Sequence, residues 1–267
     1  LSVIEQNYEK WELIIIDNFS NNSPEKIIDK FKDDRIYFHK FNNKNNIARS
    51  RNFGIKKAKF DWVAFLDSDD TWKKDKLLKV NQSITKYNPD LIYHGMYYLP
   101  KKLGFIKKII KDKSKEMKQP IYETLIIDGN GIANSSAVVR KSLLASVNFL
   151  SEDKNKYSWE DYDCWIKCSQ KTDKFIFIPD ILGNCWVGGG NVSNLEQSYI
   201  NYKNFHKIYQ NQIFELTNKK RLDWYNKFLI TWYFKKKNFY RAYVIQKKII
   251  PNDLRSYFKS IIIKFLF

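Results

Sequence analysis

Along the first ninety residues, short apolar runs alternate with segments whose apolar residues recur at helical spacing. The runs Trp11–Asp17 and Trp62–Leu66 are typical of buried strands, and Arg35–His39 alternates as a strand does. Between and after them, Ile47–Ala58 and Asp75–Tyr87 have the pattern of helices with one apolar face. This alternation predicts an α/β domain with a mostly parallel sheet covered on both faces.

The rest of the chain is less regular. We expect strands at Leu91–Tyr98, Ala137–Arg140 and Phe175–Ile178, a helix at Glu160–Gln170, and a loop or weak hairpin at Lys101–Gln119. From Tyr199 onward, clustered aromatic and aliphatic residues favour helices. We therefore expect one domain over residues 1–198 and a basic, aromatic, helical extension over residues 199–267.

Charge is distributed unevenly along the 267 residues, which carry a formal net charge of +18. From Tyr199 to the end, 15 Lys and Arg stand against Glu215, Asp223 and Asp253, a net charge of +12. Such a segment can bind an anionic membrane surface or nucleic acid, although a composition biased towards Lys, Asn and Ile would also explain it. No recognised nucleic-acid motif accompanies it, so the expected partner is an anionic membrane surface and not nucleic acid.

The cysteines and the ends of the chain add little chemistry. Cys164, Cys168 and Cys185 make no disulfide framework, and no second pair matches the first two as metal ligands, so buried free thiols are expected. Neither a signal segment nor a long apolar run is present, which favours a cytoplasmic protein. The segment at Leu1 resembles the back half of a helix, so we expect an upstream element to be missing.

Three carboxylates, those of Asp67, Asp69 and Asp70, directly follow the apolar run Trp62–Leu66. In open α/β sheets, ligands bind at the carboxyl ends of strands, where Asp17 also falls. Asp67 and Asp69 are alternate residues, so both could face one Mn²⁺ or Mg²⁺ ion, which favour carboxylate oxygen. Most short acidic turns bind nothing, and a solvated turn remains the alternative for these residues.

The stretch NIARSRNFGIKKAKFDWVAFLDSDDTW, with WELIIIDN and SVIEQNYEKW, resembles the family 2 inverting glycosyltransferases over about Leu1–Lys79. The resemblance implies the nucleotide-sugar-binding GT-A fold, with its first strand before Leu1. It implies transfer of a sugar, with inversion, from a nucleotide-sugar donor such as UDP-hexose or UDP-HexNAc. The acceptor would be a glycan or a lipid-linked saccharide of a cell-surface pathway, met at the cytosolic face of the inner membrane.

Site residues carried over from this resemblance fall into two groups. The donor group would bind the nucleotide sugar through Asp17, Arg51, Asn52 and Asp67, with Mn²⁺ or Mg²⁺ held by Asp69 and Asp67. In the catalytic group, Asp161 would be the general base and Glu160 would orient it or the acceptor. Acids also suit a helix N-terminus, so a capping role is the alternative for Glu160 and Asp161.

Two departures from the family pattern keep other functions open. Asn18 stands where the family has a second acid, and Trp186–Asn191 lacks the usual Arg or His. Without that Arg or His, either the metal alone neutralises the diphosphate or another residue serves. Asn18 and the missing upstream element leave open a relative that binds a nucleotide sugar without catalysis. A nucleotidyltransferase would use similar paired acids, but it would add a Gly-rich phosphate loop near its start.

Overall fold

The computed structural model describes residues 1–100, 111–112, 114–153, 159–187, 195–217 and 222–247. The chain divides into two compact units. The first comprises Leu1–Tyr122 and Asn130–Asn191, and the second comprises Glu123–Gly129 and Val192–Phe267. The domain boundary predicted after residue 198 would fall inside helix α7 (Leu195–Ile208), which belongs wholly to the second unit.

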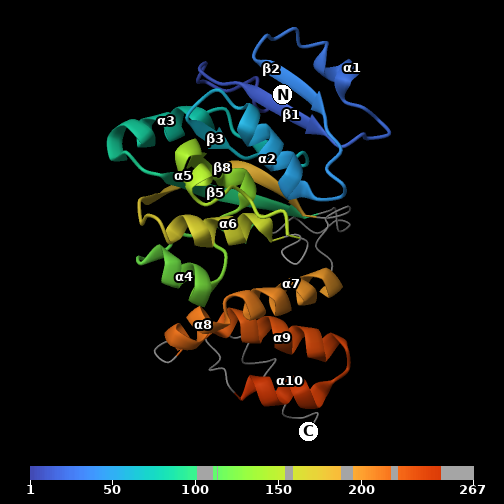
Figure 1. Cartoon of the computed structure of the whole chain (residues 1–267), viewed down its shortest axis with the longest axis vertical. Helices are drawn as coiled ribbons and strands as arrows, with labels where there is room; N and C mark the ends of the chain where they lie inside the picture. Colours follow the sequence, from blue (N-terminus) through green and yellow to red (C-terminus); the bar gives the residue numbers. More distant parts are fainter. Residues whose placement is uncertain (101–110, 113, 154–158, 188–194, 218–221, 248–267) are drawn as a thin grey trace. The chain divides into compact units, whose positions relative to one another are not determined.

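Two sheets build the first unit (Figure 1). Strands β1 (Leu13–Asp17) and β2 (Ile36–Lys40) form a parallel pair. The second sheet has the order β3–β7–β5–β8–β4, with β6 paired to β5. Its strands are β3 (Trp62–Ala64), β4 (Thr71–Trp72), β5 (Leu91–Pro100), β6 (Lys111–Asp112), β7 (Val138–Arg140) and β8 (Phe175–Val187).

The α/β class is confirmed, but the sheet is mixed and not mostly parallel. Among the described strands, β1–β2 and β5–β8 pair in parallel, whereas the other four pairs are antiparallel. Apolar patterning indicates which strands are buried, not the direction in which they run. The direction of a strand depends on the segment that connects it to the previous one. The turn Asp67–Asp70, for example, leads into β4, which pairs antiparallel with β8.

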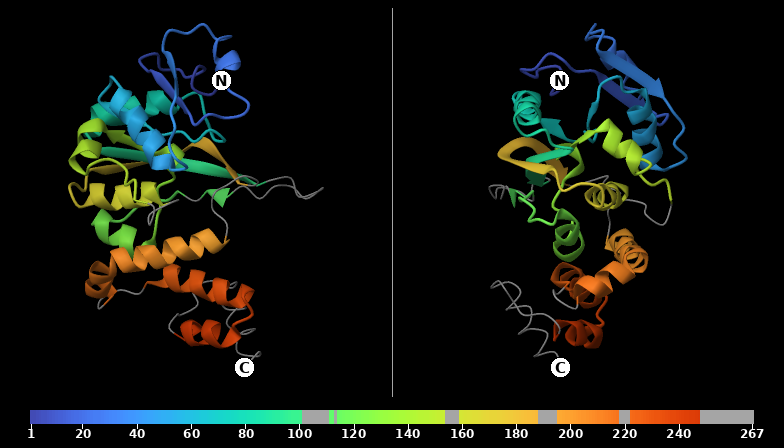
Figure 2. Two further views of the ribbon diagram at one scale, coloured as in Figure 1. Left: turned by 45° about the vertical axis from the view of Figure 1, so that its right-hand side comes forward. Right: turned by 60° about the vertical axis from the view of Figure 1, so that its left-hand side comes forward.

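Helices cover both faces of the six-stranded sheet (Figure 2). On one face, Val80 of α3 packs against Ile92 of β5 and Val138 of β7. On the other, the fully buried Trp165 of α6 lies edge-on to Phe65, with ring centroids 5.7 Å apart. The helices of this unit are α1 (Glu25–Ile28), α2 (Ile47–Lys57), α3 (Lys76–Tyr87), α5 (Lys141–Ser146) and α6 (Glu160–Ser169).

Local signals explain where α2 starts and where α3 stops. Asn46 caps α2, because its side-chain oxygen accepts the Ala48 N–H at 3.0 Å. Asn88 ends α3 in the left-handed conformation, with φ of 44°. Cys164 and Cys168 are buried free thiols on α6, as expected, and Cys185 is a half-buried free thiol. The Asn46 cap thereby fixes the start of α2, which carries a functional residue described below.

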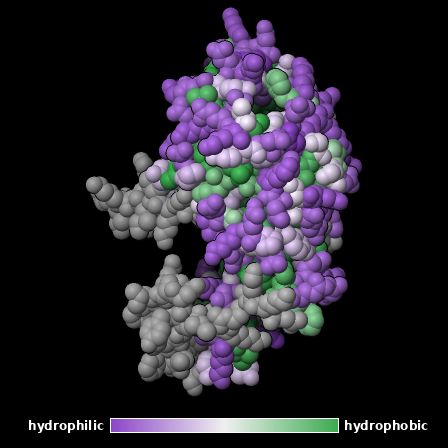
Figure 3. Space-filling view, turned by 90° about the vertical axis from the view of Figure 1, so that its left-hand side faces the viewer, coloured by the Kyte–Doolittle hydropathy of each residue, from purple (hydrophilic) through white to green (hydrophobic). Residues whose placement is uncertain are grey.

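The second unit is helical over its described residues, which confirms that expectation for the tail. It contains α7, α8 (Gln210–Thr217), α9 (Asp223–Lys235), α10 (Phe239–Gln246) and most of α4 (Ile121–Asp128). Aromatic stacking holds α7 to α9, with Tyr202 on Phe228 at 3.6 Å and Tyr199 on Trp232 at 4.2 Å between centroids. No described helix has the length and apolarity needed to cross a membrane. Among the described residues on the face drawn in Figure 3, hydrophilic side chains predominate.

Candidate functional site

The acidic turn lies directly beyond β3. Phe65 donates its N–H to the Ala137 carbonyl at 3.1 Å, so the pairing with the segment of β7 continues almost to the turn. The Asp70 N–H donates to the Asp67 carbonyl at 3.0 Å and closes the turn. The Asp67 side chain is half-buried, whereas Asp69 is exposed and bonds to none of the described residues. The turn therefore presents one anchored carboxylate and one that is open to a ligand.

Arg51 of α2 joins this turn to the start of α6. Its side chain is 13% exposed, and one guanidinium nitrogen donates to Asp67 Oδ1 at 2.7 Å while another donates to Glu160 Oε1. Burial alone would lower the pKa of Arg51, but attraction by Asp67 and Glu160 outweighs it and raises the pKa. The guanidinium therefore stays charged and links two of the acids that sequence reasoning placed in separate groups.

A short turn that sequence reasoning missed supports Asp67 from another direction. Asn134 Nδ2 donates to Asp67 Oδ1 at 2.8 Å, and the Asp67 N–H donates to Ser135 Oγ at 3.0 Å. Trp72 Nε1 donates to the Ser135 carbonyl at 2.8 Å, and both Asn134 and Ser135 are buried. In the sequence, the polar residues Asn-Ser-Ser stand just before an apolar strand. This pattern predicts an ordinary turn and gives no sign of a functional role.

Asp70, the third acid of the turn, has a structural role. Its carboxylate accepts the Trp186 N–H of β8 at 2.9 Å and bonds to the Ser135 hydroxyl. Burial raises the pKa of Asp70, and these two hydrogen bonds oppose the rise. Asp70 therefore fixes the turn against β8, which leaves Asp67 and Asp69 as its candidate ligand-binding residues.

Glu160 and Asp161 open α6, as the sequence predicted. Burial and the neighbouring Glu160 carboxylate raise the pKa of Asp161 to about 7, while Arg51 and the Tyr162 N–H oppose the rise. The residue before the helix, Trp159, makes no side-chain capping bond. A carboxyl group that titrates near neutral pH can take up a proton during a reaction at that pH. Glu160 is buried and directed at Arg51.

The side chains of Asp17 and Asn52 form no hydrogen bond with those of this cluster. Asp17 lies at the carboxyl end of β1, where it accepts hydrogen bonds from the backbone N–H and the hydroxyl of Ser20. Asn52 is buried and donates to the Leu150 carbonyl at 2.8 Å and to Glu152 Oε1 at 3.0 Å. Its carbonyl oxygen accepts the Leu150 N–H at 3.1 Å. Asn52 therefore acts as a cross-link within the first unit, and its place near the nucleotide pocket stays a prediction.

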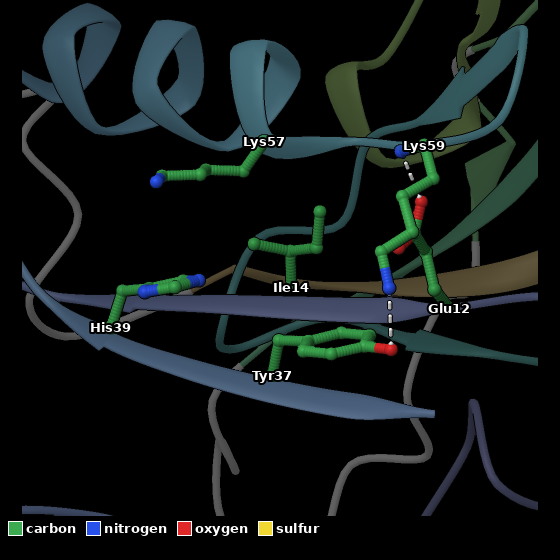
Figure 4. Close-up of a pocket in the computed structure, with 6 residues that line it drawn as sticks. All are labelled: Glu12, Ile14, Tyr37, His39, Lys57 and Lys59. Atoms are coloured by element: carbon green, nitrogen blue, oxygen red, sulfur yellow. Dashed lines mark hydrogen bonds between the residues drawn. The ribbon is translucent and has the colours of Figure 1, made fainter. Parts of the chain in front are cut away.

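A separate cavity of about 170 Å³ lies between the end of α2 and the β1–β2 pair (Figure 4). Lys59 crosses it, with Nζ donating to the Tyr37 hydroxyl at 2.8 Å and the backbone N–H donating to Glu12 Oε1 at 2.6 Å. Its lining residues are Glu12, Ile14, Tyr37, His39, Lys57 and Lys59. None of the predicted site residues lines it, so this cavity and the acidic cluster are different places.

The chemistry of the acidic turn fits a divalent cation bound together with a phosphorylated ligand. No group of three described His, Cys, Asp or Glu side chains is arranged as a metal site. Mg²⁺, however, is usually held by one or two carboxylates together with substrate phosphates. Asp69 supplies an exposed carboxylate for this arrangement, and Asp67 stands two residues away with one oxygen held by Arg51 and Asn134.

Arg51 thus joins the acidic turn at the end of β3 to the acids that open α6. Comparison with known proteins gives the class directly, because the family described as "Glycosyl transferase family 2" matches residues 1–147. The chain belongs to that family. The match extends well beyond the stretch in which the sequence resemblance was recognised and confirms that resemblance.

The names of several curated relatives refer to polysaccharide biosynthesis. The chain is 40% identical over 80 residues to a putative teichuronic acid biosynthesis glycosyltransferase, TuaG, of Bacillus subtilis, covering 29% of this chain and 32% of TuaG. It is 29% identical over 190 residues to the amylovoran biosynthesis glycosyltransferase AmsB of Erwinia amylovora, covering 67% of this chain and 61% of AmsB. The chain thus spans less than two thirds of the length of these relatives.

A third relative is named for its donor and acceptor. It is the UDP-Glc:alpha-D-GlcNAc-diphosphoundecaprenol beta-1,3-glucosyltransferase WfgD of Escherichia coli, 28% identical over 165 residues and covering 62% of this chain and 60% of WfgD. Among solved structures, S. aureus TarS (residues 1–349) in complex with UDP-GlcNAc has a TM-score of 0.60 at 17% identity, covering 98% of this chain and 73% of that chain. This likeness concerns the fold, and with the family match it confirms the GT-A fold.

Proposed function

We propose that the chain is the transferase part of an inverting, metal-dependent glycosyltransferase of surface polysaccharide synthesis. The donor would be a UDP-sugar and the acceptor a saccharide or a lipid-linked saccharide. In support, WfgD is named for a UDP-Glc donor and a diphosphoundecaprenol-linked acceptor, and TarS has been solved in complex with UDP-GlcNAc. The observation that carries the proposal is the arrangement around Arg51. This residue ties the acidic turn at Asp67 to Glu160, next to a carboxyl group with a pKa of about 7.

On the donor side, Asp67 and Asp69 would hold Mn²⁺ or Mg²⁺ at the end of β3. When bound, the ion would neutralise the diphosphate and make it a better leaving group. Arg51 and Asn134 keep Asp67 in place by bonding one of its oxygens. The second oxygen of Asp67 and the exposed carboxylate of Asp69 are the groups that we assign to the ion.

On the acceptor side, Asp161 would take the proton from the attacking hydroxyl. The hydroxyl oxygen would displace the diphosphate at the anomeric carbon from the opposite face, which gives inversion in a single step. With a pKa of about 7, Asp161 is ionised in about half of the molecules at neutral pH, which suits a general base. Because lipid-linked acceptors lie at the membrane, we place the protein at the cytosolic face of a membrane, with an anionic lipid surface and not nucleic acid as its partner.

Isothermal titration with UDP tests the donor side. We expect the chain to bind UDP more tightly with Mn²⁺ than without it, and Asp69→Ala to abolish this difference. Absence of UDP binding with and without Mn²⁺ would contradict a UDP-sugar donor.

Asp161→Asn separates catalysis from binding. The variant should bind UDP and Mn²⁺ as the parent does, since the residue lies outside the proposed metal site. It should transfer sugar 10²–10⁴ times more slowly, as expected for loss of a general base. Unchanged transfer by this variant would exclude Asp161 as the base, whereas a parent protein that binds UDP but transfers no sugar to any acceptor tested would favour a non-catalytic relative.

A further inference from the structure

Helix α10 in the second unit has one buried side and one exposed side that mixes apolar with basic residues. Ala242 is fully buried and packs with Ile230 of α9, which fixes the inner side of α10. On the exposed side, Tyr240 is 66% exposed and Val244 is 40% exposed. They are four residues apart and so lie next to each other along the helix, with the exposed Lys247 one turn beyond Val244.

The end of α9 extends this surface. Phe234 is 39% exposed and its ring meets the Phe239 ring edge-on, with centroids 5.4 Å apart. Lys235 and Lys237 are exposed and form no ion pair with a described carboxylate, whereas the neighbouring Lys236 pairs with Glu196. The name α9–α10 surface is used here for Phe234, Lys235, Lys237, Tyr240, Val244 and Lys247.

Positive charge around this surface is not balanced by acids nearby in the sequence. Between Asp223 and Asp253 the chain has seven Lys and Arg and no Asp or Glu. The exposed apolar side chains of the α9–α10 surface therefore lie among basic residues. A partner that fits such a surface carries negative charge and has an apolar layer close enough for these side chains to reach.

We propose that the α9–α10 surface binds the anionic headgroup layer of a membrane. Lys235, Lys237 and Lys247 would meet the lipid phosphates, while Tyr240, Val244 and Phe234 would enter the boundary between headgroups and acyl chains. The aliphatic Val244 favours lipid over nucleic acid, since a base stacks on an aromatic ring and not on a valine. The inference rests on the proposed function, because it assumes a lipid-linked acceptor. The residues of the α9–α10 surface would bring the enzyme to the membrane that holds this acceptor.

Vesicle sedimentation with the full chain tests this proposal without any catalytic step. The probes are vesicles of phosphatidylcholine alone and vesicles with phosphatidylglycerol added. The charge variant is Lys235→Gln with Lys237→Gln and Lys247→Gln, and the matched control removes the same charge from exposed lysines of the first unit, Lys26→Gln with Lys30→Gln and Lys32→Gln. The apolar variant is Tyr240→Ser with Val244→Ser, and its control is Phe60→Ser, also an exposed apolar residue of the first unit.

We expect the parent to bind anionic vesicles, to lose this binding in high salt, and to ignore phosphatidylcholine. At about 1 kcal/mol for each cation near the surface, the charge variant should bind about 100-fold more weakly. The apolar variant should also bind more weakly, and both controls should bind as the parent does. UDP titration of the same proteins should remain unchanged, so loss of vesicle binding is distinguishable from loss of the donor site.

Three results would overturn the proposal. The first is equal binding of anionic and neutral vesicles, and the second is an equal loss in the charge variant and its control. The third is binding of a single-stranded oligonucleotide by the parent in the absence of vesicle binding, which would assign the surface to nucleic acid instead. Circular dichroism of each variant confirms that the helices remain folded.

Discussion

The central prediction concerns the buried charge of Arg51. Arg51→Met keeps a long, unbranched side chain at this position of α2 and removes the guanidinium that bonds to Asp67 and Glu160. The Arg51 side chain is 13% exposed and that of Glu160 is 7% exposed, so little water can replace the lost bonds. Removing one partner of a buried ion pair costs about 3–5 kcal/mol, which is the loss of unfolding free energy expected here.

The loss should depend on pH through Asp161. Arg51 lowers the pKa of Asp161, which is about 7 in the parent, so this pKa should rise further in Arg51→Met. Above pH 7 the parent holds Asp161 ionised beside its arginine, whereas the variant must either leave it ionised without that partner or keep it protonated. Below about pH 6 the residue is protonated in both proteins, so its part of the difference disappears. The destabilisation is therefore predicted to grow as the pH rises from 6 to 8.

Urea unfolding at pH 6 and pH 8, followed by circular dichroism, measures both effects. Arg49→Met on the same helix is the matched control, since Arg49 pairs with Glu152 at 3.6 Å with side chains 31% and 46% exposed. An exposed pair of this kind is worth about 0–1 kcal/mol. Equal losses for the two variants, or a loss at Arg51 that is the same at both pH values, would refute the linking role of Arg51.

Three further predictions follow from other contacts. Because the pKa of Asp161 is raised from 3.8 to about 7, the protein should lose stability as the pH rises between these values. Above pH 7, urea unfolding of Asp161→Asn should give a free energy of unfolding about 2–4 kcal/mol higher than that of the parent. A parent that is at least as stable as Asp161→Asn at pH 8 would contradict this prediction. Ser135→Ala should raise the KM for the donor more than it lowers kcat, because it removes the hydroxyl that accepts the Asp67 N–H and so loosens the turn. Ser135→Thr keeps a hydroxyl and should restore part of the lost donor affinity. Unchanged kinetics in Ser135→Ala would show that the hydroxyl does not position the turn. Gly183→Ala should lower the free energy of unfolding, measured by thermal unfolding, by about 1–3 kcal/mol. A Cβ at this position would lie 2.5 Å from Met96 Sδ and 3.0 Å from the Thr71 carbonyl oxygen. Stability equal to that of the parent would mean that β4, β5 and β8 can move apart at no cost.

The sequence by itself determined the family and most of the strands and helices of the first ninety residues. Apolar runs and helical spacing placed β1, α2, β3 and α3 within a few residues, because burial of one face sets the period of the pattern. The spacing of the acids after β3 carried the family resemblance. It needed no tertiary contact, since these residues lie within one short stretch of chain.

Strand direction and the link between the two acidic groups were decided by tertiary structure. Apolar patterning cannot tell a parallel from an antiparallel neighbour, and so the mixed sheet was not foreseen. Arg51 reaches Glu160 across 109 positions, and Asn134 reaches Asp67 across 67, and nothing in the local pattern around either residue records such a contact. The pKa of Asp161 is likewise a property of the fold, because burial and the neighbouring charges, and not the residue type, set it near 7.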